Sequence, residues 1–326
     1  MTGTPHSSLI GGTPSVRSIV LAQALRVSLR PLADHAGVGG PRLTGLRWMS
    51  DRIGHFDVPR GTTVDAISVG DHRAAVVNAV DADPRDGVML YLHGGGFVLG
   101  SPDSHRAVAA RLSRSAGVPV LLPAYRKAPE HPFPAAADDV LFWYRHLLSQ
   151  GVTPDRIVVG GDSAGGHLLC GLIEQLRATG LPVPAGAVLF SPLLDLGLVD
   201  GDERAARRRD PFSSAAFARR AVEVYLGEVD PEDPRVDVLS ADFGGWPPTL
   251  IQVGGTEMLL EDARALAAAL AAAGVPHQLQ VWRGQVHSFH LMSMVAPEPR
   301  RALEDAGRFV RDCLSDAAID TVDRAG

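Results

Sequence analysis

Cysteine, long apolar runs and an excess of positive charge are all missing or scarce in this chain of 326 residues. Its two cysteines, Cys170 and Cys313, are too few for a disulfide framework, and Cys170 lies in an apolar helical run that favours a buried thiol. We therefore expect a reducing, cytoplasmic setting. The longest apolar stretch near the start, residues 19–25, is broken by Gln23 and lacks a cleavage pattern. It is too short to span a bilayer, so we expect no stable membrane insertion.

Charge also limits the possible partners. The formal net charge is -6 and the pI is near 6.0, which predicts no basic surface for nucleic acid or anionic lipid. The local arginine runs at 207–209 and 219–220 are typical of solvated helix faces. Metal-ligand types such as His93 and residues 103–105 show no consistent ligand spacing, so we expect neither a metal site nor a cofactor.

What the chain does have is a regular alternation of β-branched runs with alanine- and leucine-rich stretches, beginning near residue 63. This alternation predicts a mainly parallel sheet with helices on both faces. We expect strands at 64–69, 74–80, 88–92, 118–122, 156–160, 186–190, 249–253 and 278–282, and helices at 104–116, 135–150, 164–179 and 259–274. Apolar spacing from Ile19 to Leu32 predicts a further amphipathic helix that lies on the rest of the protein.

One segment, from about 197 to 245, breaks the alternation because it is charged, contains prolines and is helical in character. It falls between two predicted core strands. An insertion there would lie at the carboxyl edge of the sheet, where ligands bind in open α/β folds. We interpret it, together with the first ~45 residues, as a candidate lid.

Two glycine-rich stretches follow predicted strands. Residues 161–165 read Gly-Asp-Ser-Ala-Gly, in which small residues flank Ser163 on a turn that exposes its hydroxyl. Residues 93–97 read His-Gly-Gly-Gly-Phe and offer backbone N–H groups that can approach a developing negative charge. Their order and separation fit the arrangement of a nucleophile and an oxyanion hole in lipases and esterases.

A nucleophilic serine needs a base and an orienting acid, which follow it in the order acid then histidine in this arrangement. His287 lies just past the last predicted strand and is our choice of base, ahead of His290 and His167. For the acid, Glu257 lies on the loop after the strand at 249–253. Asp262, already in the next helix, and Asp195, one strand earlier, remain alternatives.

Taken together, these stretches resemble the hormone-sensitive-lipase-like family of bacterial α/β-hydrolase carboxylesterases over roughly residues 60–312. The residues that carry the resemblance are 93–97, 125–136, 161–166, 247–251 and the loops of Glu257 and His287. The resemblance implies an α/β-hydrolase fold with an eight-stranded, mainly parallel sheet and a helical cap. It also implies that Ser163 is the nucleophile, Glu257 the acid and His287 the base, with Gly95, Gly96 and Ala164 donating the oxyanion-hole N–H groups.

The expected organisation follows from this resemblance. N-terminal cap helices would occupy 1–50 and a cap insertion 197–245, with the hydrolase core split between 51–196 and 246–326. Phe97 is a candidate for lining the acyl site, whereas Arg126 and Glu130 are expected to brace the structure internally. Gln285 occupies a place before the histidine that is usually apolar, which predicts a more polar pocket mouth.

The predicted activity is hydrolysis of short- to medium-chain acyl esters of small molecules through an acyl-serine intermediate. An acyltransferase or an amide- or lactone-cleaving enzyme with the same triad is an alternative that the sequence leaves open. A catalytically silent receptor on the same scaffold is disfavoured because His287 is present. The oligomeric state also stays open, with a homodimer as one option.

Overall fold

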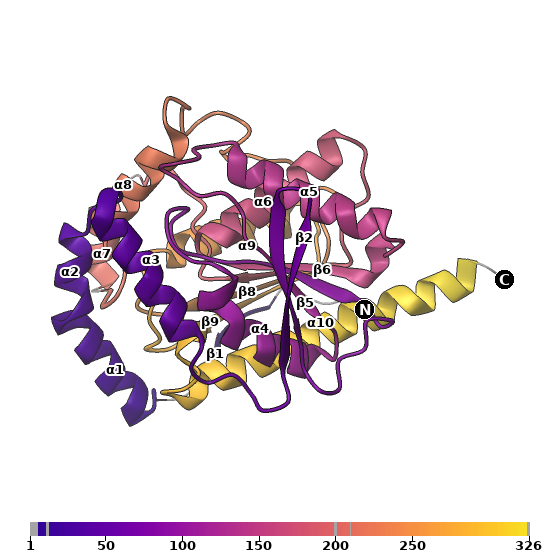
Figure 1. Cartoon of the computed structure of the whole chain (residues 1–326), viewed down its shortest axis with the longest axis horizontal. Helices are drawn as coiled ribbons and strands as arrows, with labels where there is room; N and C mark the ends of the chain where they lie inside the picture. Colours follow the sequence, from indigo (N-terminus) through magenta and orange to yellow (C-terminus); the bar gives the residue numbers. More distant parts are fainter. Residues whose placement is uncertain (1–5, 11–12, 199–200, 209, 325–326) are drawn as a thin grey trace.

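The chain forms one mixed sheet covered by helices on both faces (Figure 1). A computed structural model describes residues 6–10, 13–198, 201–208 and 210–324. Within those residues, nine strands are ordered β1-β9-β8-β7-β6-β4-β5-β3-β2. They are β1 (His6–Ile10), β2 (Thr63–Val69), β3 (His72–Asn78), β4 (Val88–Leu92), β5 (Val120–Pro123), β6 (Ile157–Asp162), β7 (Gly186–Phe190), β8 (Thr249–Gly254) and β9 (His277–Trp282).

Strand direction places the functional loops together. β2 and β3 pair antiparallel at one edge, whereas the strands from β5 to β1 in the sheet order pair parallel. The central pair β4 and β6 is in register from Val88 opposite Ile157 to Leu92 opposite Gly161. The carboxyl ends of β4, β6, β8 and β9 therefore meet at one edge of the sheet, where ligands bind in folds of this kind.

The helices form two layers because the central strands are buried on both faces. Alternate residues of β4 point to opposite sides: Met89 and Tyr91 pack with α4 and α10, and Leu90 and Leu92 pack with α5, α6 and α9. These helices are α4 (Pro102–Ala116), α5 (Ala135–Ser149), α6 (Ala164–Ala178), α9 (Leu260–Ala272) and α10 (Pro297–Arg324), with short 3-10 turns at η1 (Pro154–Arg156) and η2 (Phe289–Met292).

The predicted fold class is confirmed, with one correction to the strand count. The eight expected strands and four expected helices are present, each with boundaries within two residues of the prediction. The ninth strand, β1, pairs parallel to β9 at the sheet edge. Its five residues, HSSLI, carry too short and too polar a pattern to stand out in the sequence.

The single amphipathic helix expected from Ile19 to Leu32 is two helices, α1 (Val16–Val27) and α2 (Leu29–His35), separated at Ser28. Pro31 accounts for the break, because proline has no N–H to donate to the carbonyl of Val27 four residues earlier. The inner face of α1 packs through Leu25 on a cluster that includes Trp282 and Phe289.

The remaining helices gather with α1 and α2 on one side of the molecule, at the left of Figure 1. They are α3 (Gly40–Gly54), α7 (Gly201–Arg208) and α8 (Ala215–Leu226). The segment that breaks the sequence alternation thus contributes α7 and α8 to the same side as the N-terminal helices. No helix within the described residues is both long enough and apolar enough to cross a membrane.

Candidate active site

Ser163 stands on the turn between β6 and α6. Its φ of 51° and ψ of -119° lie outside the regions favoured by side chains, which is the strained turn that presents a hydroxyl at the end of a strand. The flanking glycine is required by close approach, since a Cβ on Gly165 would lie 1.9 Å from the Leu92 carbonyl oxygen. The small residues around Ser163 therefore let α6 begin directly against β4.

His287 reaches Ser163 from the loop after β9. Its Nε2 lies 3.0 Å from the Ser163 Oγ, and its Nδ1 lies 2.9 Å from Oε2 of Glu257. Burial lowers the pKa of His287, but the hydrogen bond and charge of Glu257 outweigh this effect and the net shift is upward. The imidazole is thus held in place from both nitrogens and its charged form is favoured.

Glu257 is fully buried on the loop after β8. Burial raises its pKa, although the hydrogen bond and charge of His287 and the hydroxyl of Ser191 oppose the shift. Its second oxygen, Oε1, accepts hydrogen bonds from the Gly254 N–H and from Ser191 Oγ, the latter at 2.6 Å. The carboxylate therefore has donors on both oxygens, as a buried charge requires.

The alternative bases lie elsewhere. His290 is buried with its Nε2 2.9 Å from Gln252 Oε1, and burial lowers its pKa to about 3. The Nε2 of His167 lies 2.8 Å from the Val236 carbonyl oxygen. Each of these rings thus pairs with another part of the protein.

The alternative acids are also engaged. Asp262 accepts the backbone N–H groups of Leu194 and Asp195 at 2.9 and 3.1 Å and pairs with Arg204 at 2.8 Å. The Asp195 carboxylate pairs with the same Arg204 guanidinium at 3.4 Å. Both carboxylates therefore hold the segment after β7 in place.

The glycine loop after β4 presents its backbone toward this site. Gly95 has a φ of 116°, and a Cβ there would lie 2.5 Å from the backbone of Leu99, so only glycine fits. The Gly94 N–H is already used, because it donates to Asp162 Oδ1 at 2.9 Å. The expected donors Gly95 and Gly96 follow it on the same loop, and Ala164 begins α6.

A buried carboxylate beside the nucleophile, Asp162, was not among the sequence predictions. Besides the Gly94 N–H, it accepts the Tyr91 hydroxyl at 3.0 Å, and His105 Nε2 lies 3.2 Å from it. These charged and hydrogen-bonded partners hold its pKa at about 2 despite burial. Asp162 thus ties the glycine loop to the strand that carries Ser163. Its place next to the serine was the only sequence signal.

Two further residues that support the site also depend on contacts that the sequence does not display. Ser191, at the end of β7, donates to Glu257 and accepts the Ser288 N–H at 3.2 Å. Gln285 is buried and hydrogen-bonds Ser18 of α1, and its effect on the polarity of the pocket mouth stays a prediction. Gln285 joins the His287 loop to the N-terminal helices.

Phe97 and the charged residues of the proline-rich loop pack within the protein. The Phe97 ring is fully buried and stacks on Tyr225 of α8 with centroids 3.7 Å apart. Its assignment to the acyl site remains a prediction. Arg126 binds Asp139 at 2.8 Å and Glu130 binds Arg47 at 2.9 Å, so each braces a different helix.

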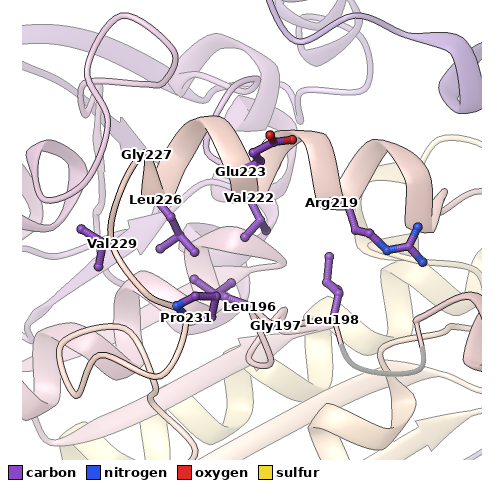
Figure 2. Close-up of a pocket in the computed structure, with 10 residues that line it drawn as sticks. All are labelled: Leu196, Gly197, Leu198, Arg219, Val222, Glu223, Leu226, Gly227, Val229 and Pro231. Atoms are coloured by element: carbon purple, nitrogen blue, oxygen red, sulfur yellow. The ribbon is translucent and has the colours of Figure 1, made fainter.

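A cavity of about 320 Å³ is lined by one face of α8 and by the segments around residues 196–198 and 227–231 (Figure 2). Ala221 and Phe217 of this helix lie toward Gly96, whereas Val222 and Leu226 line the cavity. The remaining lining residues are Leu196, Gly197, Leu198, Arg219, Glu223, Gly227, Val229 and Pro231. None of the three residues Ser163, His287 and Glu257 lines this cavity.

Comparison with known proteins gives a consistent picture. Residues 89–291 match a family model described as the alpha/beta hydrolase fold. An acetyl-hydrolase of Streptomyces hygroscopicus is 41% identical over 83% of this chain and 89% of its own length. The carboxylesterase/phospholipase LipF of Mycobacterium tuberculosis is 35% identical over 96% of this chain and 86% of its own length.

Solved structures agree with these relatives. The esterase EstE5, in crystals soaked with p-nitrophenyl butyrate, superposes with a TM-score of 0.85 at 33% identity, covering 92% of this chain and 99% of EstE5. An esterase of the bacterial hormone-sensitive lipase family superposes with a TM-score of 0.84 at 34% identity, covering 93% of this chain and all of that one. The names of these proteins describe hydrolases, which does not favour acyl transfer.

Proposed function

Because the chain belongs to the hormone-sensitive-lipase-like family of bacterial α/β-hydrolase carboxylesterases, we propose that Ser163, His287 and Glu257 carry out its ester hydrolysis. The protein is a serine carboxylester hydrolase. The observation that supports the assignment is the continuous chain of hydrogen bonds from Ser163 Oγ through both ring nitrogens of His287 to Glu257. This is the geometry by which a base activates a serine and an acid orients the base.

The first half of the reaction forms the acyl-serine. Ser163 Oγ bonds to the ester carbonyl carbon while its proton passes to His287 Nε2 and the carbonyl π electrons move to oxygen. The tetrahedral intermediate then collapses, its bond to the alcohol oxygen breaks, and His287 returns the proton to the departing alcohol. In the second half, water attacks the acyl carbon while His287 removes one of its protons. The second tetrahedral intermediate then collapses, the bond between the acyl carbon and Ser163 Oγ breaks, His287 returns the proton to Oγ, and the carboxylic acid leaves.

Two groups stabilise the charges that arise. Glu257 accepts the Nδ1–H bond and favours the imidazolium that forms when His287 takes the proton. The oxyanion would be met by the N–H groups of Gly95, Gly96 and Ala164. Removing one donor of this kind typically costs about 10²–10³ in rate.

We also propose that the helices within residues 1–50 and 197–245 form a cap over the core made by 51–196 and 246–326. Strand β1 (His6–Ile10) joins the core sheet and is not part of this cap. The gathering of α1, α2, α3, α7 and α8 on one side of the molecule supports this division (Figure 1). Phe97 stacks on Tyr225 of α8 directly after the glycine loop, so the cap is in contact with the site. A roofed site of this kind favours small ester substrates with short to medium acyl chains over long triglycerides.

A cytoplasmic location is the remaining part of the proposal. It rests on the small number of cysteines in the chain, two, which are both buried and are too few for a disulfide framework.

Active-site labelling tests the assignment of the nucleophile. A fluorophosphonate should modify the wild-type protein at the peptide that contains Ser163, and Ser163→Ala should lose both the label and ester turnover by a factor on the order of 10⁴–10⁶. Ser149→Ala, at the exposed end of α5, is the matched control and should keep both. More than a few per cent residual activity in pure, folded Ser163→Ala would overturn the proposal.

A further inference from the structure

Three arginines line a second hollow in the protein surface, and its lining includes none of Ser163, His287 and Glu257. It has a volume of about 280 Å³, and its lining comes from the start of α1, the start of α10 and the segment just before α10. The starts of these two helices lie near each other in Figure 1. Its walls are Arg17, Met294, Ala296, Pro297, Arg300, Arg301 and Glu304. Three positive side chains face one carboxylate, so the pocket has an excess of positive charge.

This charge is partly compensated by two carboxylates beside the pocket, those of Asp57 and Glu298. Among the described residues, neither Arg17 nor Arg301 forms an ion pair. Arg300 donates from Nε to the Ser293 carbonyl, and its guanidinium is 3.9 Å from the Asp57 carboxylate. Arg17 and Arg301 are thus the two cations of the pocket for which no described carboxylate forms an ion pair, on a protein whose net charge is -6.

The two walls of the pocket are fastened to each other. Glu298, in the first turn of α10, accepts the Ser15 N–H at 2.6 Å and the Ser18 hydroxyl at 2.9 Å. These bonds hold the beginning of α1 against the beginning of α10, so Arg17 is kept beside Arg300 and Arg301. The arrangement therefore belongs to the fold and does not depend on one loose side chain.

Exposed apolar side chains occur on the elements that form the pocket, and one of them, Met294, lines it. Val16 is 75% exposed, Val20 61% and Met294 55%, and the first two flank Arg17 on the outer side of α1. Phe56, next to the Asp57 that bonds Ser293 at 2.9 Å, is 61% exposed. Exposed apolar side chains grouped around one site are typical of an interaction surface.

We propose that this face docks on an anionic lipid bilayer, with lipid phosphates in the arginine pocket and the neighbouring apolar side chains in the interface. We call it the docking face and define it by Arg17, Arg300, Arg301, Val16, Val20 and Met294. Arginines next to exposed apolar side chains fit the surface of an anionic bilayer better than they fit a protein partner or a soluble anion. Apolar residues lower their free energy in the acyl boundary, while arginines attract anionic headgroups and keep their charge at the water side.

Vesicle sedimentation tests the proposal. The full chain is mixed at low salt with large unilamellar vesicles of phosphatidylcholine alone, or of an equal mixture of phosphatidylcholine and phosphatidylglycerol. We expect sedimentation with the mixed vesicles and little with the neutral ones. Arg17→Gln combined with Arg301→Gln should lower the partition coefficient at least about tenfold, since each arginine near an anionic surface contributes roughly a factor of five.

Matched variants separate this face from general attraction. Arg73→Gln with Arg145→Gln removes the same charge from exposed arginines on β3 and α5, and it should leave binding within about twofold of wild type. Val20→Ser with Met294→Ser should weaken binding, whereas Val80→Ser, at a residue that is 72% exposed elsewhere, should not. Circular dichroism and thermal melting check that each variant is folded.

Three outcomes would overturn the proposal. One is absence of binding to the mixed vesicles. Another is equal loss in the Arg73 and Arg145 control, which would indicate attraction without a defined face. The third is evidence that the docking face binds something other than a bilayer, either a small anion or a second copy of the chain. Inorganic phosphate that raises the melting temperature of wild type but not of the Arg17 and Arg301 variant, without vesicle binding, would indicate a small-anion site. A dimer in light scattering that Val20→Ser with Met294→Ser dissociates would indicate a second copy of the chain.

Discussion

Glu257 illustrates how much of the site depends on single hydrogen bonds between residues far apart in the chain. One of its oxygens accepts from His287 and the other from Ser191 and the Gly254 backbone. Burial raises the pKa of the carboxyl, so its charge depends on these donors. Asp262 is also buried, and burial raises its pKa to about 6, but its donors are the Leu194 and Asp195 amides. The two acids are distinguished by their partners and not by their burial.

This difference predicts the outcome of two matched substitutions. Glu257→Gln should lower kcat by about 10³–10⁴, because an amide cannot stabilise the imidazolium and can hold the wrong tautomer. Asp262→Asn, the control in a similarly buried place, should lower kcat by less than about tenfold and act mainly on stability. Steady-state kinetics with p-nitrophenyl acetate and thermal melts of both variants measure this. A larger kcat loss in Asp262→Asn would contradict the assignment of the acid.

The raised pKa of His287 predicts the pH dependence. His287 must be neutral to take the Ser163 proton, and Glu257 is the leading cause that favours its charged form. The kcat/KM should therefore rise with pH through one step with a midpoint above the ordinary value of 6.5 and then reach a plateau. In Glu257→Gln the main cause is removed, so the midpoint of the residual activity should move to lower pH. An unchanged midpoint would show that another group controls the step.

For single residues of the site, the sequence predicts which ones follow a strand but not which residues they contact in the folded protein. Ser163, Glu257 and His287 each follow an apolar run, which is why their meeting could be predicted. Ser191 and Gln285 follow strands equally well. Their contacts with Glu257 and Ser18 join segments that only the folded sheet brings together.

Helix α1 contributes no catalytic residue, but it contacts the segment that carries His287. It packs through Leu25 on a cluster that contains Trp282, Val286 and Phe289, and these three residues surround His287 in the sequence. The base is therefore positioned partly by a helix more than 250 residues earlier in the chain, as the Ser18 to Gln285 contact also shows, with a separation of 267 residues. Periodicity predicted a helix here, and Pro31 is the signal in the sequence that could have predicted its break at Ser28. The short strand β1 could not be predicted, because it is defined by its pairing with β9.

Removal of the N-terminal elements should affect catalysis before it affects the rest of the sheet. Deleting the first ~35 residues removes β1, α1 and α2, exposes the Trp282 and Phe289 cluster and loosens the His287 loop. We therefore expect kcat to fall more than KM rises, with a far-ultraviolet circular dichroism signal lowered only by the share of these three elements. Gln285→Ala, which removes one contact of α1 with that loop, should give a smaller change in the same direction. A truncated protein with wild-type kcat would contradict a positioning role for α1.

For the whole molecule, the sheet order explains why a short list of loops is sufficient for the chemistry. β4, β6, β7, β8 and β9 are the central parallel strands, and their carboxyl ends supply the glycine loop, Ser163, Ser191, Glu257 and His287 in turn. The fold class could be predicted because alternating strands and helices have few ways to cover both faces of a parallel sheet. The cap could be located only as a break in that alternation, since its helices follow no such rule.

The cap and core together predict the substrate range of the enzyme. Because α8 lies directly against Gly96 through Ala221 and Phe217, the space for an acyl chain beside the glycine loop is limited. Rates on p-nitrophenyl esters should be highest for acyl chains of about two to eight carbons and should fall steeply for longer ones. Phe217→Ala should widen the space and move the optimum to longer chains, whereas Phe243→Ala, a buried aromatic residue packed on Trp246, should lower stability without moving it. Efficient hydrolysis of long-chain emulsified triglyceride by wild type, or a chain-length profile that Phe217→Ala leaves unchanged, would contradict a roofed acyl site.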